Sequence, residues 1–285
     1  MFYRFTKSGA RVAVDLAGAY DGETVFILGG SPKLRDAIED LSRPGVVTLA
    51  MNNVPTVFPR PTLWIGADKP ACFAPSIYHD PAIQKFTIIS RSNETVGVDE
   101  PTRRLVRECP NVLFFGTRED VRVRDFLAPT RHLAWWSSVF PLALQLAWKL
   151  GFRRAVLVGC DFSMPRHDQY AWPTALTGSQ RDYSQRTYDA DVGRLSALAP
   201  HFRRHGYEVV SATPGSRANE VLDVVRLRDE VRRAVEGRDP STADTMKLAH
   251  SSELAPGARG EAPDIDLYQM AALDVEGIRL RGIIG

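Results

Sequence analysis

In the stretch ETVFILGGSPKL, residues 23–34, four apolar residues are followed by two glycines, a serine and a proline. Charged residues then follow at helical spacing. This pattern predicts a buried strand over 24–30 and a helix over 33–42. Glycines at such a junction let the backbone approach a ligand, and N–H groups at a helix start attract phosphate. A capped turn, with Ser31 as N-cap and Pro32 at the first helical position, explains the same letters. The motif matches neither G-x-G-x-x-G nor the Walker pattern, which disfavours an ordinary NAD enzyme or P-loop ATPase.

Short apolar runs and helical stretches alternate along the chain as far as residue 212. Further strands are predicted at 45–53, 61–70, 85–91, 111–116, 154–162 and 207–212, with helices at 138–150 and 191–205. This alternation is typical of βαβ units. We therefore expect an α/β fold: a Rossmann-like, mostly parallel sheet flanked by helices, with a helical or irregular C-terminal tail.

The last part of the chain differs in composition. Residues 219–236 predict a charged amphipathic helix, whereas 237–264 are rich in Pro, Gly, Ser, Asp and Ala and show no periodicity. The second pattern is typical of a linker. We expect one Rossmann-like domain over 1–236, a linker over 237–264, and a docking tail over 265–285 that could contact a second subunit.

Composition and charge are those of an ordinary globular chain. Its 285 residues are 44% hydrophobic and carry a net charge of +2, and 30 of the 36 basic residues are scattered arginines. Both genome composition and an anionic partner explain that excess. No apolar run is long enough for a membrane span, and no secretory signal is readable, so a cytoplasmic location is expected. The three cysteines share no metal-ligand spacing, so no zinc site or disulfide framework is expected.

Polar residues follow several of the predicted strands at their carboxyl ends. Asn52 and Asn53 close the second strand, Asp68 closes the third, and Asp161 closes a later one. In open α/β sheets, ligands bind beyond the carboxyl ends of strands, near a switch in strand order. These residues, with the turn at 29–31, predict one ligand site at that edge.

Four motifs carry a family resemblance: VFILGGSPKL (25–34), AMNNV (50–54), WWSSVFPLALQLAWKLGFRRAVLVGCDFSMPRHDQYAW (135–172) and VVSATPGS (209–216). In this order and spacing they resemble the bacterial sialyltransferases of glycosyltransferase family 42. The related superfamily includes motility-accessory flagellin glycosyltransferases and archaeal 6-hydroxymethyl-dihydropterin diphosphokinases. The resemblance covers residues 24–216. Its most specific part is the serine pair, long helix, strand and acidic end at 137–161, followed by Tyr170.

The resemblance implies roles for individual residues. Those that contact the nucleotide, its phosphates or the transferred group would be Gly29, Gly30, Ser31, Asn52, Asn53, Ser137 and Ser138. Tyr170 stands where a tyrosine hydroxyl assists the departing phosphate. Asp68, at the end of its strand, is a further candidate for contact with the nucleotide.

Two departures from the family pattern concern catalysis. A second tyrosine of the sialyltransferases is Ser163 here, and their histidine base has no counterpart in DYSQRTYDAD, residues 182–191. A base must reach the acceptor hydroxyl at hydrogen-bond distance. The catalytic candidates are Tyr170 with the carboxylates Asp161, Asp182 and Asp189; Asp191 and His167 are further candidates for the base. His201 and His205 are expected to face solvent at a helix end.

The sequence thus predicts a nucleotide-sugar-dependent glycosyltransferase that requires no cofactor and no metal. Its acceptor would be a glycan, a protein side chain or a hydroxylated base in DNA, the last as in bacteriophage DNA modification. One alternative is a magnesium-dependent diphosphokinase, with Asp68 or Asp161 as metal ligand. Another is a nucleotide-binding module that lost its chemistry. The D-x-D triplets at 189–191 and 264–266 are expected to bind no metal.

Overall fold

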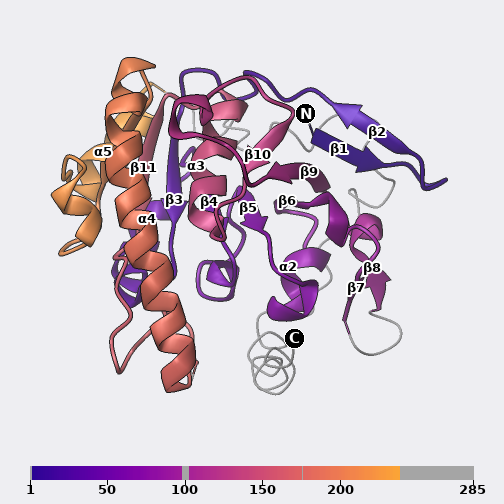
Figure 1. Ribbon diagram of the computed structural model, residues 1–285, viewed down its shortest axis with the longest axis horizontal. Helices are drawn as coiled ribbons and strands as arrows, with labels where there is room; N and C mark the ends of the chain where they lie inside the picture. The colour runs from indigo at the N-terminus through magenta and orange to yellow at the C-terminus, as the bar shows by residue number, and fades with distance from the viewer. Residues whose placement is uncertain (1, 98–102, 175, 238–285) are drawn as a thin grey trace.

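The computed structural model describes residues 2–97, 103–174 and 176–237, and a mostly parallel sheet forms its centre (Figure 1). The strand order is β12–β11–β3–β4–β5–β6–β9–β1–β2, and β10 pairs with β9 off this path. The strands are β1 (Phe2–Phe5), β2 (Arg11–Val14), β3 (Thr24–Leu28), β4 (Thr48–Met51), β5 (Leu63–Gly66), β6 (Gln84–Ile88), β9 (Val112–Arg118), β10 (His132–Ala134), β11 (Arg154–Val158) and β12 (Glu208–Ser211). Only the β1–β2 and β1–β9 pairs of this sheet are antiparallel. The expected α/β class is confirmed.

Helices cover both faces of the sheet. They are α1 (Ile38–Leu41), α2 (Pro75–His79), α3 (Val139–Leu150), α4 (Gly178–Arg204) and α5 (Leu227–Val235). Short 3-10 turns join them: η1 (Pro32–Ala37), η2 (Val54–Thr56), η3 (Pro70–Cys72), η4 (Ile89–Arg91), η5 (Val106–Glu108), η6 (Val123–Asp125) and η7 (Arg217–Glu220). A separate two-stranded sheet pairs β7 (Thr95–Val96) with β8 (Arg104–Leu105).

The central strands are apolar because both of their faces are buried. In β3, Val25 and Ile27 belong to one hydrophobic core, and Phe26 and Leu28 belong to the other. Successive side chains of a strand point to opposite faces, so a strand covered on both sides reads as a continuous apolar run. The first core lies under α3 and α4, and the second under η1, α1, α2 and α5.

Several predicted elements differ from the observed ones. The helix expected over 33–42 is split into η1 and α1, and the helix expected over 219–236 is only α5, preceded by η7. The helix expected over 191–205 is wrong at its start, because α4 begins at Gly178. Its first half is polar and lacks an apolar stripe, so periodicity did not reveal it; Thr177 and Gln180 begin it with a capping box. The β1–β2 hairpin and β10 were not predicted.

The strand order reverses between β3 and β11. From β3 the chain adds β4, β5, β6 and β9 on one side, and later β11 and β12 on the other. The two strands pair in parallel as far as Leu28 and Val158. A ligand site is expected beyond the carboxyl ends of strands at such a switch point. The 29–31 turn and the residues after β11 therefore meet where the sequence predicts a site.

The expected linker over 237–264, apart from Gly237, and the docking tail over 265–285 lie outside the described residues. In the part of the chain that is described, no helix is both long and apolar enough to cross a membrane.

Candidate functional site

A pocket of about 810 Å³ opens at the carboxyl ends of β3, β4, β5 and β11 and is closed on one side by α4. Ten of the predicted site residues line it: Gly29, Gly30, Ser31, Asn52, Asn53, Asp68, Ser138, Asp161, Tyr170 and Asp191. They come from strand ends and loops far apart in the sequence. The fold thus brings most of the predicted site together at its switch point.

The two glycines after β3 are required by the protein around them. A Cβ at Gly29 would lie 2.4 Å from the Gly159 carbonyl oxygen and 2.7 Å from Cys160 Sγ. A Cβ at Gly30 would lie 2.7 Å from the Trp172 ring. Both distances are shorter than ordinary carbon contacts, so close packing by itself accounts for both glycines. Their contact with phosphate stays a prediction.

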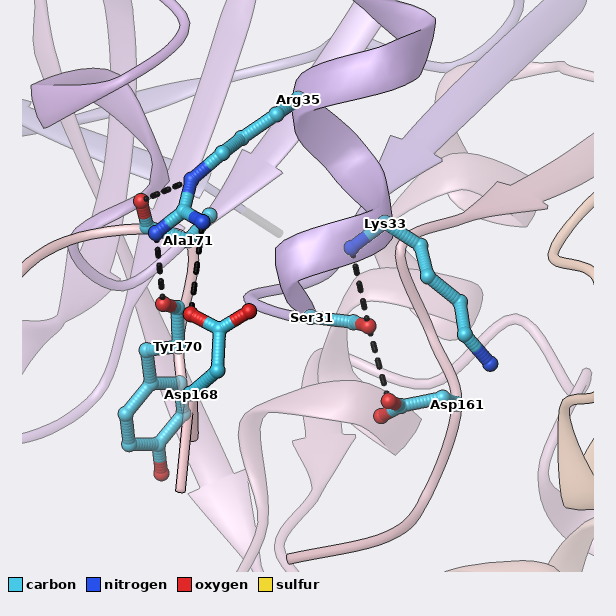
Figure 2. A network of polar contacts seen from close by, with 7 residues as sticks. All are labelled: Ser31, Lys33, Arg35, Asp161, Asp168, Tyr170 and Ala171. Carbon is cyan, nitrogen blue, oxygen red and sulfur yellow. Dashed lines mark hydrogen bonds and ion pairs between the residues drawn. The ribbon is translucent and has the colours of Figure 1, made fainter. Parts of the chain in front are cut away.

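Ser31 connects the turn after β3 to the end of β11 (Figure 2). Its Oγ donates to Asp161 Oδ2 at 2.8 Å and accepts from the Lys33 N–H at 3.4 Å, and its own N–H donates to the Gly159 carbonyl at 2.9 Å. Ser31 therefore caps η1, as predicted, and also fixes the carboxylate of Asp161. Within the described part of the chain, the second oxygen, Asp161 Oδ1, has only a 3.5 Å contact with the Ser163 N–H.

The two asparagines after β4 have different environments. The Asn53 amide is used by the protein: Nδ2 donates to the Cys72 carbonyl at 2.9 Å, and Oδ1 accepts from the Ala74 N–H at 3.1 Å. Asn52 Oδ1 is buried and has no hydrogen-bond partner among the described residues. Asn52 also adopts a left-handed backbone with φ of 51°. A strained residue with an unpartnered acceptor is a better candidate for ligand contact than its neighbour.

Two other non-glycine residues at the site share the left-handed backbone. Ser137, before α3, has φ of 59°, and Phe162, after β11, has φ of 54°. Conformations of this kind are sparsely populated and concentrate at functional sites. Ser137 itself is exposed and does not line the pocket, whereas Ser138 does.

Ser138 caps α3 and binds a buried carboxylate on α4. Its Oγ accepts from the Phe140 N–H at 3.3 Å and donates to Asp191 Oδ2 at 2.6 Å. Asp191 Oδ1 accepts from Arg194 at 2.9 Å. Burial raises the pKa of Asp191, and the Ser138 hydroxyl and the Arg194 guanidinium partly oppose that shift. The α4 helix is thus attached to the start of α3 inside the pocket wall.

Two tyrosines of the pocket lie beside each other. Tyr170 stacks on Trp172, with ring centroids 4.8 Å apart and planes 6° from parallel. Tyr188, on α4, is packed against the core and is near Tyr170 and Asp161. Burial and then the neighbouring Tyr170 phenol raise the pKa of Tyr188 well above its ordinary value. Tyr188 therefore keeps its proton and can act as a hydrogen-bond donor to an anion.

The pocket wall carries negative charge and neutral donors. Among the described residues that line it, Asp68, Asp161 and Asp191 are acidic, and none is Lys, Arg or His. The Asp68 residue is exposed as a whole, but surrounding protein atoms partly desolvate its carboxyl group and raise the pKa. The positive charge of Arg91 opposes that shift. An anionic group bound here would be held by hydroxyl and amide groups. No group of three His, Cys, Asp or Glu side chains able to hold a metal is found within the described ranges.

Several candidate bases lie away from the pocket. Asp182 and His167 are exposed and do not line it. Asp189 is also exposed, pairs with Arg217 and accepts from Gln185 at 2.9 Å. The expectation that both histidines near the end of α4 face solvent is wrong for His201, which is 4% exposed, although His205 is exposed.

The pocket-facing residues of α4 were largely missed by sequence reasoning. Gln180, Tyr183, Ser184, Tyr188 and Asp191 all line the pocket, and of these only Asp191 was a candidate. They recur every three or four residues, at 180, 183 and 184, 188 and 191, which places them on one helix face. A polar and aromatic stripe at helical spacing after a capping box was the available signal.

No protein-family model matches this chain, and no curated protein matches it. Solved structures of the sialyltransferase CstII do match. The chain is 13% identical to CstII from Campylobacter jejuni in complex with cytidine-5′-monophosphate, with a TM-score of 0.41 over 73% of this chain and 87% of that one. Against CST-II with a trisaccharide acceptor and CMP, identity is 13% and TM-score 0.39, over 72% and 87% of the two chains. Because identity and TM-scores are this low, the function is inferred from the pocket and its residues.

Proposed function

We propose that this chain is a glycosyltransferase that binds a nucleotide-activated sugar in the switch-point pocket and transfers the sugar to an acceptor hydroxyl. The observation that carries the proposal is the convergence of the motif residues. The turn at 29–31, Asn52, Ser138, Asp161 and Tyr170 are spread along the chain but line one pocket. The sequence resemblance implies contact with a nucleotide-sugar donor for all of these except Asp161, which is a candidate from its strand end, and the switch point is where such a ligand is expected.

The charge of the pocket favours a donor with a single phosphate over one with a diphosphate. Hydroxyl and amide side chains are the polar donors of the pocket, and the described lining residues include no cationic side chain. Diphosphates carry more charge and are usually held by Arg, Lys or a metal ion. The same charge pattern disfavours DNA as acceptor, because binding of its backbone depends on Lys and Arg. The acceptor we propose is a glycan or a protein hydroxyl.

In the proposed reaction, the acceptor oxygen attacks the anomeric carbon of the donor. The bond from that carbon to the phosphate oxygen breaks, and its electron pair leaves with the nucleotide. Tyr170 and Tyr188 would donate hydrogen bonds to the departing phosphate, which stabilises the charge that develops there. In the family pattern a second tyrosine stands at the position that is Ser163 in this chain. Tyr188 would take over the role of that tyrosine.

A carboxylate of the pocket would take the acceptor proton. Asp191 has both oxygens occupied, by Ser138 and Arg194, whereas Asp161 keeps Oδ1 close to free. We therefore assign the base to Asp161. Asp161→Asn should retain donor binding and lose sugar transfer, because the amide cannot accept the proton.

One observation supports a second candidate function. Asp68 and Asp161 both line the pocket, and carboxylates are the ligands that Mg²⁺ uses beside phosphates. These two residues would hold Mg²⁺ in a magnesium-dependent diphosphokinase of the pterin type. ATP binding that requires magnesium would distinguish it from the glycosyltransferase.

The test is a thermal-shift and calorimetric screen against CMP, UDP, GDP, TDP, AMP and ATP, alone and as sugar nucleotides, in EDTA and in magnesium. A ligand that binds the folded state raises the melting temperature by mass action. We expect stabilisation by one nucleotide class in EDTA. It should be lost in Ser31→Trp, whose side chain would block the turn beside the pocket.

Stabilisation only by ATP with magnesium would favour the diphosphokinase. Binding without transfer to any acceptor, with Tyr170→Phe affecting affinity alone, would indicate a nucleotide-binding module. No shift with any compound would contradict a nucleotide site. CMP, which is present in two of the sialyltransferase structures, is the first probe.

A further inference from the structure

The segment 168–172 carries Tyr170 and Trp172 into the pocket, yet it is neither helix nor strand. Arg35, on η1, contacts it at three points (Figure 2). Its Nε donates to the Ala171 carbonyl at 2.9 Å, Nη2 donates to the Tyr170 carbonyl at 3.3 Å, and Nη1 pairs with Asp168 Oδ1 at 3.3 Å. One guanidinium therefore binds successive groups of an irregular segment.

A second contact attaches the segment to the turn after β3. The Ala171 N–H donates to the Gly30 carbonyl at 2.8 Å, and the stacked rings of Tyr170 and Trp172 lie against the Gly30 Cα. Asp168, where the segment begins, has a left-handed backbone with φ of 49°. Aspartate is one of the few residues besides glycine that adopt this conformation readily, so the chain can turn here at the start of the segment.

The geometry depends on the shape of the arginine head group. The ion pair to Asp168 is largely exposed, at 46% and 63% for the two side chains, so the pair by itself contributes little. The two carbonyl bonds give the contact its direction. A planar guanidinium can donate to both carbonyls and the carboxylate at once, whereas a lysine ammonium is a point charge on a flexible stem.

We propose that Arg35 is a positioning residue: its guanidinium holds the 168–172 segment on the 29–31 turn and thereby sets the Tyr170 hydroxyl in the pocket. Arg35 does not itself line the pocket. It acts through Tyr170, and the role given to Tyr170 rests on the proposed function. Holding the segment is a property of the free protein and can be measured without any ligand.

The first experiment is hydrogen–deuterium exchange on the full chain without ligand. In Arg35→Met, amides of 168–172, above all that of Ala171, should exchange about tenfold faster or more, while the central strands keep their protection. In Arg35→Lys, these amides should exchange at rates between those of wild type and Arg35→Met. Arg43→Met is the matched control, because Arg43 is similarly exposed and makes an ion pair with Asp40 near the end of α1; it should leave 168–172 unchanged. Unchanged exchange in Arg35→Met, or faster exchange throughout the sheet, would overturn the proposal.

The second experiment tests positioning with CMP in a double-mutant cycle. Arg35→Met should weaken CMP binding about tenfold in the wild-type background and by less than about twofold in Tyr170→Phe, because the lost interaction is then already absent. A merely structural role would give equal losses in both backgrounds, and that result would overturn positioning through Tyr170. If wild type binds no nucleotide, the proposed function fails, and the exchange experiment still decides whether Arg35 holds the segment.

Discussion

The pocket has two walls of different construction. The sheet wall, formed by the turns after β3, β4 and β11, is made of glycines, strained residues and short polar side chains that are bonded to one another. The helix wall, formed by the first half of α4, presents tyrosines, glutamine and serine, and its side chains are mostly half-buried or exposed.

The difference follows from what surrounds each wall. In the sheet wall, a Cβ at Gly29 would lie 2.4 Å from the Gly159 carbonyl oxygen, so nothing can be added there without moving the backbone that follows β11. At the start of the helix wall, a Cβ at Gly178 would meet, among the described residues, only the end of the flexible Arg181 side chain, at 3.7 Å. We infer that the sheet wall holds its groups rigidly, whereas the helix wall before Tyr188, where Tyr183 is exposed, tolerates changes and can set specificity.

The largest expected effect is that of a single methyl group added to each wall. Gly29→Ala should lower the free energy of unfolding by about 3 kcal/mol, because the Cβ overlaps the carbonyl of Gly159, the residue directly after β11. Gly178→Ala should raise it by about 0.5 kcal/mol, since alanine favours a helix and the Arg181 side chain is only in ordinary contact. Urea denaturation measures both. Equal changes in the two variants would remove the distinction between the walls.

The two N-cap residues give the next comparison. Ser31→Ala should cost about 2 kcal/mol, because it removes a hydrogen bond to the Asp161 carboxylate as well as the cap of η1. Thr177→Ala should cost about 1 kcal/mol, the usual value of a helix cap. The two melting temperatures, with hydrogen exchange at 178–184 for the second variant, provide the check. A larger loss in Thr177→Ala than in Ser31→Ala would contradict this ranking.

Two aspartates on α4 should shift the pH dependence of stability in opposite directions. The pKa of Asp191 is raised above its ordinary 3.8, so its contribution is fully present below that pH and is lost as pH rises through the folded-state value. The pKa of Asp189 is lowered by its hydrogen bond from Arg217, so its contribution is present above pH 3.8 and is lost as pH falls.

The measurement is the free energy of unfolding from pH 3 to pH 7 for wild type, Asp191→Asn and Asp189→Asn. Relative to wild type, Asp191→Asn should gain stability as pH rises above 3.8, by at most about 1.4 kcal/mol per pH unit. Asp189→Asn should lose stability over the same range. Parallel curves for the two variants would show that Asp191 is no more buried than Asp189 in solution.

Tyr183 should show the smallest effect. Its side chain lines the pocket but is 60% exposed, so Tyr183→Ala should change the free energy of unfolding by less than about 0.5 kcal/mol. CMP affinity should change less than about twofold, because the phosphate donors that we propose are Tyr170 and Tyr188 and do not include Tyr183. A tenfold loss of CMP affinity would show that Tyr183 contacts the nucleotide and would contradict this assignment.

The placement of the sheet-wall residues at one edge of the sheet could be predicted from the sequence. Gly29, Asn52 and Asp161 follow apolar runs directly, and the carboxyl ends of parallel strands meet at one edge. Their placement thus needs only strand recognition. Distinguishing Asn52 from Asn53 needs the loop at 72–74, which lies beyond any local pattern.

The helix wall could not be predicted in the same way. The first half of α4 has almost no buried residues before Asp191, so it lacks the apolar period that identifies helices. Tyr188 approaches Tyr170 only through the tertiary packing of α4, and the sequence shows merely that Ser163 replaces a tyrosine of the family pattern. The buried His201 was missed because burial depends on the element packed beside it.

The central claim is that neutral donors from both walls hold the phosphate of the donor. The most direct measurement is calorimetric titration of CMP and of cytidine, in EDTA, into wild type, Tyr170→Phe and Tyr188→Phe. We predict that CMP binds wild type at least about tenfold more tightly than cytidine, and that removal of either phenol reduces this ratio while leaving cytidine affinity unchanged. Equal affinities for CMP and cytidine in wild type, or a ratio that appears only with magnesium, would contradict the claim.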